Sequence, residues 1–162
     1  MQLKEFNKNS IETLKEKTPH IYKSVLHVTL PFFRAHKVLF DKGESVLKEE
    51  FNLTQSELDV ISCLYYSSEE EHTLTPTKLY ELMLFSSGGM TKLLKKLEEK
   101  ELIKRVDSKE DKRVKNVQLT KKGIDIMLSA IDRIISFEDD YFNKLDNKEQ
   151  KEFAKLLNKL LD

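Results

Sequence analysis

The chain has 162 residues, of which 39% are hydrophobic and 35% charged, and its 28 Lys and Arg balance its 28 Asp and Glu. This composition is typical of a soluble, mostly helical protein with one compact domain or two small lobes, and the 4 Gly and 3 Pro argue against an all-β fold. No apolar run is long enough to span a bilayer, the first residues do not form a signal peptide, and one Cys cannot make an internal disulfide, so we expect a cytoplasmic protein without membrane partners.

The charges are distributed unevenly along the chain. Residues 87–122 contain 12 Lys or Arg and 6 Asp or Glu, a net charge of +6, whereas residues 41–85 contain 3 and 10, a net charge of −7. A polyanion would respond to the local basic segment rather than to the zero total. The same charges also suit an ordinary solvated helix face with ion pairs, and charge alone leaves both interpretations open.

The N-terminal third is expected to be helical. Residues 1–17 have an apolar side and are expected to form a short helix or an arm. Thr18-Pro19 is a typical helix start because a hydroxyl N-cap precedes a Pro at the first helical position. The helix predicted from there continues to about residue 51. Pro31 lacks the N–H that would bond four residues back, so we expect a break or kink there.

Two further helix starts follow. Thr54 and Glu57 have the spacing of a capping box, which predicts a helix over residues 55–67. After a short strand at residues 72–74, Thr75-Pro76 repeats the pattern of a capping hydroxyl and a Pro and predicts a helix that ends near residue 84.

The next helix begins after a turn at residues 85–87 and has two distinct faces. Its inner stripe, at helical spacing, consists of Met90, Leu93, Leu94 and Leu97. Its opposite face carries Gly88, Thr91, Lys92, Lys95 and Lys96. Two short helices joined by a tight turn, the second with a cationic outer face, are what reading a DNA major groove requires.

The remaining chain predicts a β-hairpin, or wing, and two helices. Residues 103–106 and 115–119 are β-prone, and a charged loop joins them. Thr120 is expected to cap a long helix that ends near residue 145.

The last helix is predicted to start at a capping box formed by Asp146 and Glu149. Its apolar stripe reaches the final residues, and little chain remains to cover it. We therefore expect a second subunit to cover this stripe.

Residues 74–123 resemble the winged helix-turn-helix of the MarR family of bacterial transcriptional regulators. The matching pieces are the segment LTPTKLYELMLFSSGGMTKLLKKLE, the strand LIKR, the wing triplet DKR at 111–113, and VQLT shortly before Gly123. Residues 54–66 also match the preceding helix of that family. The flanking helices match in position and length more than in residues.

The resemblance implies a mainly α fold with a small β-hairpin wing, in which a winged helix-turn-helix is joined to a helical dimerisation region. Residues 1–50 and 123–162 would supply the dimerisation helices, and residues 51–122 the DNA-binding domain. Two copies would bind a pseudo-palindromic operator in double-stranded DNA. The second helix of each helix-turn-helix would enter the major groove and each wing the adjacent minor groove.

The residues that we expect to contact DNA lie at the amino ends of the two short helices, on the outer face of the second, and at the wing. They are Thr75, Thr77, Ser86, Ser87, Gly88, Thr91, Lys92, Lys95, Lys112 and Arg113. Hydroxyl and N–H groups at a helix start can hold phosphates or base edges, and wing cations suit a narrow minor groove. Asp111 is expected to hold the wing in shape. The alternative is that these residues are only helix caps and solvated surface charges.

Two positions depart from the pattern of the family. Glu101 stands where the family usually has the Gly that ends the second helix in a left-handed conformation, so we expect the turn to be arranged differently. Lys95 stands where close relatives often have an acidic residue, which would add positive charge near the DNA.

The resemblance also implies a small aromatic acid or phenolic ligand that relieves repression. His20, His27 and Arg34 are spaced seven apart and are candidates to line its pocket, with the alternative that they are ordinary polar side chains. No cofactor, metal or catalytic constellation is indicated, and we do not expect an enzyme.

Two other functions remain open. A winged-helix module could bind a protein instead of DNA, in which case apolar side chains should appear on the outer face of the 87–100 helix. Cys63 could alternatively be a redox switch, although a free Cys inside an apolar helix is often only a small buried hydrophobe.

Overall fold

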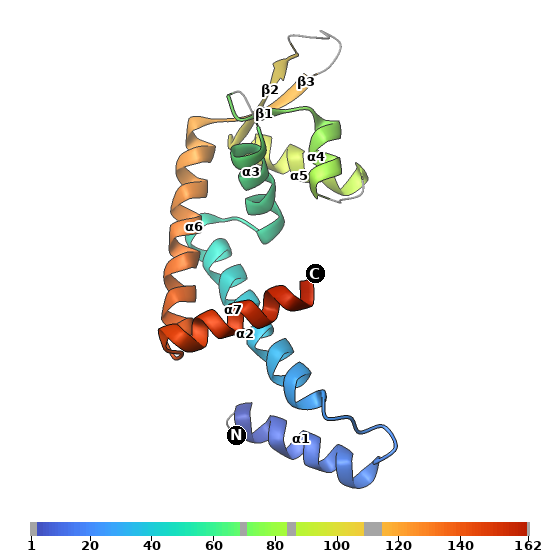
Figure 1. Ribbon diagram of the computed structural model, residues 1–162. Helices are drawn as coiled ribbons and strands as arrows, with labels where there is room; N and C mark the ends of the chain where they lie inside the picture. Colours follow the sequence, from blue (N-terminus) through green and yellow to red (C-terminus); the bar gives the residue numbers. More distant parts are fainter. Residues whose placement is uncertain (1–2, 69–70, 84–86, 109–114, 162) are drawn as a thin grey trace. The chain divides into compact units, whose positions relative to one another are not determined.

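The structure is a computed structural model that describes residues 3–68, 71–83, 87–108 and 115–161 (Figure 1). By its internal contacts the chain divides into two compact units, Met1–Gly43 and Glu44–Asp162. Within the described ranges, none of the helices combines the length and the apolar character that crossing a bilayer would need.

The first unit contains helix α1, Leu3–Lys17, and the beginning of helix α2, Leu26–Phe51. The expectation of a short helix or an arm at the start of the chain is confirmed as a helix over the described residues Leu3–Lys17, but the helix start predicted at Thr18-Pro19 is wrong. The backbone N–H and the hydroxyl of Thr18 both donate to the carbonyl oxygen of Leu14, each at 2.9 Å. Thr18 therefore closes α1 instead of capping the next helix, and turns separate it from α2.

Helix α2 continues through Pro31, so of the break or kink predicted there the break is wrong, and a kink stays a prediction. Pro31 is the sixth residue of the helix, and the N–H that it lacks would have bonded to the His27 carbonyl. Both residues are exposed. Water can therefore donate to that carbonyl, and the helix continues at the loss of a single internal hydrogen bond.

In the described part of the second unit, the C-terminal end of α2 is followed by five further helices. These are α3 (Gln55–Ser67), α4 (Pro76–Met83), α5 (Ser87–Glu99), α6 (Lys121–Phe142) and α7 (Asn147–Leu161).

The helix caps predicted for the second unit are confirmed. Thr54 Oγ1 accepts from the Glu57 N–H at 3.3 Å while Glu57 Oε2 accepts from the Thr54 N–H at 2.8 Å, a complete capping box. Asp146 and Glu149 form the same reciprocal arrangement at the start of α7. At the start of α6, Thr120 Oγ1 accepts from the Gly123 N–H at 3.0 Å.

Three strands form one antiparallel sheet in the order β1-β3-β2. They are β1 (Thr73–Leu74), β2 (Ile103–Asp107) and β3 (Lys115–Leu119). The register pairs Ile103 with Leu119 and Thr73 with Gln118. The hairpin predicted from the sequence is thus confirmed, and the loop that joins β2 to β3 falls at residues 109–114, outside the described residues.

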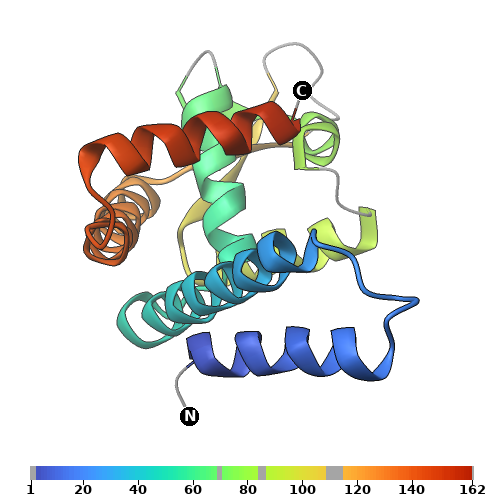
Figure 2. The ribbon, with the colours of Figure 1, turned by 60° about the horizontal axis from the view of Figure 1, so that its bottom comes forward.

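The core of the second unit lies between α3, α5, the sheet and α6. Its fully buried side chains are Leu47, Val60, Ile61, Leu64, Leu79, Met90, Leu94, Leu97, Val117, Met127 and Ala130. Helix α7 turns sharply away from the end of α6 in both views (Figures 1 and 2). It is attached there by the Phe142 and Phe153 rings, whose centroids are 6.2 Å apart, and by hydrogen bonds from the Gln150 amide to the carbonyls of Phe142 and Leu145.

Helix α5 ends with Glu101 in the left-handed conformation, φ 61°. The Leu102 N–H donates to the Leu97 carbonyl at 3.0 Å and the Glu101 N–H to the Glu98 carbonyl at 2.9 Å, the pair of bonds that defines a Schellman motif. The expectation of a different turn is therefore wrong. The C-terminal contacts of the helix require the left-handed residue, and Glu adopts it despite its Cβ.

Candidate nucleic-acid interface

Helix α4 begins at Thr75, whose Oγ1 accepts from the Lys78 N–H at 3.0 Å. The cap orients the helix so that Leu79 is fully buried, whereas Thr77 and Lys78 are exposed. Thr75 is itself exposed. The capping role of Thr75 is thus confirmed, and its contact with DNA stays a prediction.

Helix α5 separates its residues onto two faces, as predicted. Met90, Leu94 and Leu97 are fully buried in the core, and Leu93 is half-buried against it. Among the described side chains of this helix, the exposed ones other than Gly89 are polar: Thr91, Lys92, Lys95, Lys96 and Glu99. The outer face of α5, defined as these exposed residues, therefore offers hydroxyl and ammonium groups to a partner.

The Lys95 Nζ atom lies 3.9 Å from Oε1 of Glu99, one turn further along the same face. Both side chains are more than 60% exposed, so the pair contributes little to stability. A phosphate group could take the place of Glu99 at small cost.

Some of the residues predicted for the interface lie outside the described ranges. Ser86 precedes α5 and Asp111, Lys112 and Arg113 follow β2, and all four are outside the described residues. Ser87 and Gly88 are the first residues of α5, which agrees with the predicted helix start.

The base of the wing is joined to α5 by an ion pair. The Nε atom of Arg105 on β2 lies 3.4 Å from Oε2 of Glu98, near the end of α5, and both side chains are about one-third exposed. A second pair, Lys115 with Asp107, joins the two strands where the wing loop leaves the sheet. Sequence reasoning did not identify Arg105 and Glu98, because neither belongs to a capping or helical spacing pattern and the turn between them decides whether they meet.

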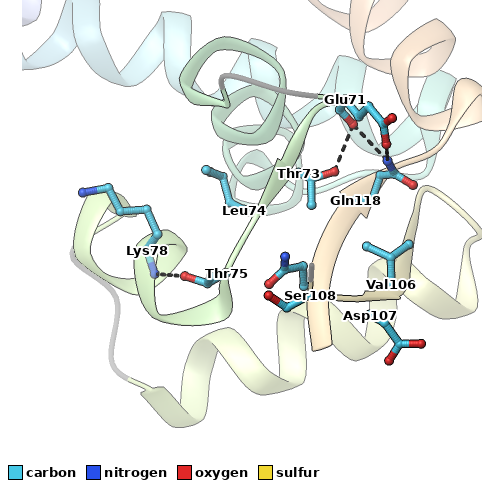
Figure 3. Close-up of a pocket in the computed structure, with 10 residues that line it drawn as sticks. Glu71, Thr73, Leu74, Thr75, Lys78, Val106, Asp107, Ser108 and Gln118 are labelled. Atoms are coloured by element: carbon cyan, nitrogen blue, oxygen red, sulfur yellow. Dashed lines mark hydrogen bonds between the residues drawn. The ribbon is translucent and has the colours of Figure 1, made fainter. Parts of the chain in front are cut away.

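A hollow of about 540 Å³ lies between the wing sheet and the start of α4 (Figure 3). Thr75 and Lys78 line one side, and Val106, Asn116 and Gln118 line the floor on the outward face of the sheet. The Glu71 carboxylate and carbonyl accept hydrogen bonds from the Gln118 amide and shape the rim. The hollow thus connects the two parts of the domain that are expected to face DNA.

The three candidates for a ligand pocket lie in the first unit. His20 lies in the turns before α2, whereas His27 and Arg34 lie on α2. His20 is therefore not on the same helix as His27 and Arg34, because α2 begins only at Leu26. The His27 Nε2 atom is 3.3 Å from the Tyr22 hydroxyl. Ligand binding by these residues stays a prediction.

Cys63 lies in α3, where its side chain is half-buried and packs against the core. Its Sγ atom is 3.9 Å from Ser67 Oγ, one turn further along the helix. This placement agrees with the reading of Cys63 as a small hydrophobe, and a redox role stays a prediction.

Comparisons with known proteins place this geometry among transcriptional regulators. The family model described as Transcriptional regulator SarA/Rot matches residues 42–129, more than half of the chain. The HTH-type transcriptional regulator PapX of Escherichia coli is 33% identical over 79 residues, which are 49% of this chain and 46% of PapX, so the chain matches about half the length of that relative.

Solved structures show the same fold. The MepR–DNA complex of Staphylococcus aureus has a TM-score of 0.66 at 24% identity, over 82% of this chain and 95% of MepR. Wild-type MarR of E. coli has a TM-score of 0.63 at 21% identity, over 80% of this chain and 95% of MarR. The winged helix-turn-helix expected from the sequence is thus confirmed as the fold.

Proposed function

The chain belongs to the SarA/Rot family of transcriptional regulators, and from this premise we propose that two copies of it bind a pseudo-palindromic operator in duplex DNA. Its fold is that of MarR and MepR. It would act in the cytoplasm as a repressor that a small aromatic acid or phenol releases from the DNA.

The observation that carries the proposal is the composition of the outer face of α5. A helix that binds a protein partner presents apolar or aromatic anchors, whereas a helix that binds in a major groove presents donors for phosphates and bases. The exposed side chains described on this face are Thr, Lys and Glu, without an apolar one. This face therefore supports DNA as the partner over a protein.

The helix-turn-helix and the wing would make different contacts with DNA. Thr91 and Lys92, early on α5, would enter the major groove, and Thr75 and Thr77 at the start of α4 would hold the adjacent backbone. The positively charged Lys112 and Arg113 would bind in the minor groove, as the resemblance to the family implies. MepR, which shares the fold, has been solved with DNA.

The working unit is proposed to be a dimer because large apolar faces remain uncovered within each unit of the chain. In the second unit, α7 has no buried residue among those described, and Leu156 and Leu160 are 53% and 78% exposed. In the first unit Val28 and Phe33 are more than 60% exposed. Covering such faces is what a second copy would do.

Dimerisation would also set the distance between the α5 helices of the two copies, and with it the affinity for the operator. The two reading helices must be separated by about one turn of DNA, roughly 34–36 Å. A ligand that binds better to a dimer with another separation lowers operator affinity by shifting the population toward that state. Release from the operator then relieves repression.

The test is a gel-shift titration of the purified protein on duplex DNA from its own upstream region, over a range of salt concentrations. Lys92→Ala and Arg113→Ala should each weaken binding and reduce the slope of log K against log salt by about 1, because one phosphate contact is lost. Lys151→Ala, which removes an exposed lysine from α7, is the matched control and should leave both quantities unchanged.

Absence of salt-dependent binding by the wild-type protein would exclude the proposal and favour the protein-interaction module. Addition of aromatic acids to the same titration tests the ligand. A loss of binding on peroxide treatment that persists in Cys63→Ser would exclude Cys63 as the switch.

A further inference from the structure

The residue that follows α5, Lys100, joins three helix ends through one ammonium group. Its Nζ atom lies 2.8 Å from Glu57 Oε1 in the first turn of α3 and 2.6 Å from the carbonyl oxygen of Asn52, directly after α2. Asn52 itself takes the left-handed conformation that ends α2, φ 52°. Lys100 therefore connects the C-terminal end of α5 to the place where α2 passes into α3.

The carboxylate in this contact is buried and fully engaged. Glu57 is 2% exposed, and its second oxygen accepts from the N–H and the hydroxyl of Thr54. Burial raises the pKa of Glu57, but the hydrogen bonds from Lys100 and Thr54 outweigh it and hold the pKa below its ordinary value. The group is thus ionised at neutral pH, and a buried carboxylate that loses its cation would be strongly unfavourable.

This pair differs from the exposed ion pairs within single helices of the described chain. Lys37 with Asp41 and Lys95 with Glu99 each join residues of one helix and have both side chains more than half exposed. The Lys100–Glu57 pair joins residues 43 positions apart, with Lys100 28% and Glu57 2% exposed. Exposed pairs within a helix contribute little and fix nothing between elements, whereas a buried hydrogen-bonded pair has one favourable geometry.

Such directionality matters for α5 because, apart from the partly exposed pair of Glu98 with Arg105, its other attachment is mainly apolar. Met90, Leu94 and Leu97 hold it to the core by hydrophobic contact, which depends on buried area and not on direction. Base recognition, in contrast, depends on hydrogen-bond geometry, which weakens with small misplacements.

We propose that Lys100 is a positioning residue, which fixes the rotation and axial position of α5 against α2 and α3 so that the outer face of α5 meets the bases in register. The inference rests on the proposed function, since it assumes that α5 reads DNA. Lys100 lies eight residues after Lys92, about 12 Å along a helix, so it acts through the helix and not by touching the bases.

The test compares specific with non-specific binding. Affinities of wild type, Lys100→Met, Lys100→Arg and Lys151→Met are measured on the operator and on a scrambled duplex of equal length, at several salt concentrations. Urea unfolding of each variant establishes that it is folded under the conditions of the assay.

Lys100→Met should lower the ratio of specific to non-specific affinity about tenfold, because misaligned base contacts each lose discrimination. Its non-specific affinity and salt slope should stay as in wild type, since no phosphate contact is removed. Lys100→Arg should keep the ratio of wild type, because a guanidinium can donate both to the Glu57 carboxylate and to the Asn52 carbonyl oxygen. Lys151→Met removes the same charge from an exposed position of α7, outside the outer face of α5, and should leave the ratio unchanged.

An unchanged ratio in folded Lys100→Met would overturn the inference. So would a reduced salt slope with an unchanged ratio, which would make Lys100 a phosphate contact. If Lys100→Met is not folded, Glu57→Gln breaks the same pair with little change of volume, and an unchanged ratio in that variant overturns the inference equally. Failure of the proposed function is distinguished from these outcomes because it would appear already as an absence of binding by the wild type.

Discussion

At the residue scale, Glu101 shows a side chain held in a conformation that glycine adopts more easily. The left-handed region costs an L-residue about 1–2 kcal/mol, and the Schellman bonds at the end of α5 require it. Glu101 is also anchored, since its Oε2 is 3.0 Å from Lys122 Nζ and its carbonyl accepts from the Thr120 hydroxyl at 2.8 Å. The fold thus imposes the conformation on the residue.

Glu101→Gly should therefore raise the free energy of unfolding by about 0.5–1 kcal/mol, the relief of strain less the greater entropy of glycine in the unfolded chain. Urea unfolding measures it. Glu101→Ala is the control, because it removes the exposed ion pair with Lys122 but keeps the Cβ, and its stability should change by less than about 0.5 kcal/mol. Equal effects of the two substitutions would contradict the explanation by strain.

Glu57 predicts how stability depends on pH. Its pKa in the folded protein lies below the ordinary value of 4.5, so its ionised form is favoured by folding. In the unfolded chain the pKa of Glu57 has the ordinary value, so the stabilisation by the ionised carboxylate is fully present above about pH 4.5. It is lost as the pH falls below this value through the lower pKa of the folded state.

Glu57→Gln should accordingly be less stable than wild type at pH 7, and the difference should narrow as the pH falls into this acid range. Chemical unfolding at a series of pH values from neutral to acid measures both curves. Parallel curves would show that the carboxylate does not titrate with folding.

At the scale of elements, the junction between β3 and α6 depends on Gly123. A Cβ at this position would overlap the Leu102 carbonyl oxygen and lie 2.9 Å from Leu119 Cδ1. The Leu102 carbonyl is also the acceptor for the Thr120 N–H, so it cannot move away without loss of that bond. Only glycine therefore allows α6 to start so close to the end of α5.

Gly123→Ala should destabilise the protein by about 1–3 kcal/mol, as overpacking does in a well-packed interior. Gly43→Ala provides the contrasting control. Gly43 lies inside α2 with open space where a Cβ would be, so alanine should stabilise by about 0.5–1 kcal/mol through its higher helix propensity. Thermal unfolding of both variants measures the two signs, and a loss of stability in both would contradict the assignment.

At the scale of the whole molecule, the uncovered apolar faces predict association. Leu156→Glu places a charge in the exposed stripe of α7 and should raise the dissociation constant of the proposed dimer at least tenfold. Asn158→Glu makes the same change of charge at an exposed polar position of the same helix and should have little effect. Sedimentation over a range of concentrations measures both. A monomeric wild type would remove the basis of the prediction.

The residues of the proposed interface were largely predictable, because their pattern is local. The stripe Met90, Leu94 and Leu97 and the opposite lysines follow from helical spacing alone, and the structure places them on the buried and exposed faces as predicted. The contacts that orient this face were not predictable. Lys100 and Glu57 are 43 residues apart, and nothing in the sequence near either one indicates the other.

The sequence alone determined the helix caps, whose hydrogen bonds close within one turn of chain: the capping boxes at Thr54 and Asp146 and the caps at Thr75 and Thr120. It also determined the two strands of the wing, because two β-prone runs flank one charged loop. Only the tertiary structure decided whether a local signal is used. Thr18 closes a helix instead of opening one, Pro31 is accepted inside a helix, and Glu101 takes a left-handed conformation. Local patterns specify which bonds are available, whereas packing between distant segments selects among them, because the free energy of many buried contacts exceeds that of one cap or one strained residue.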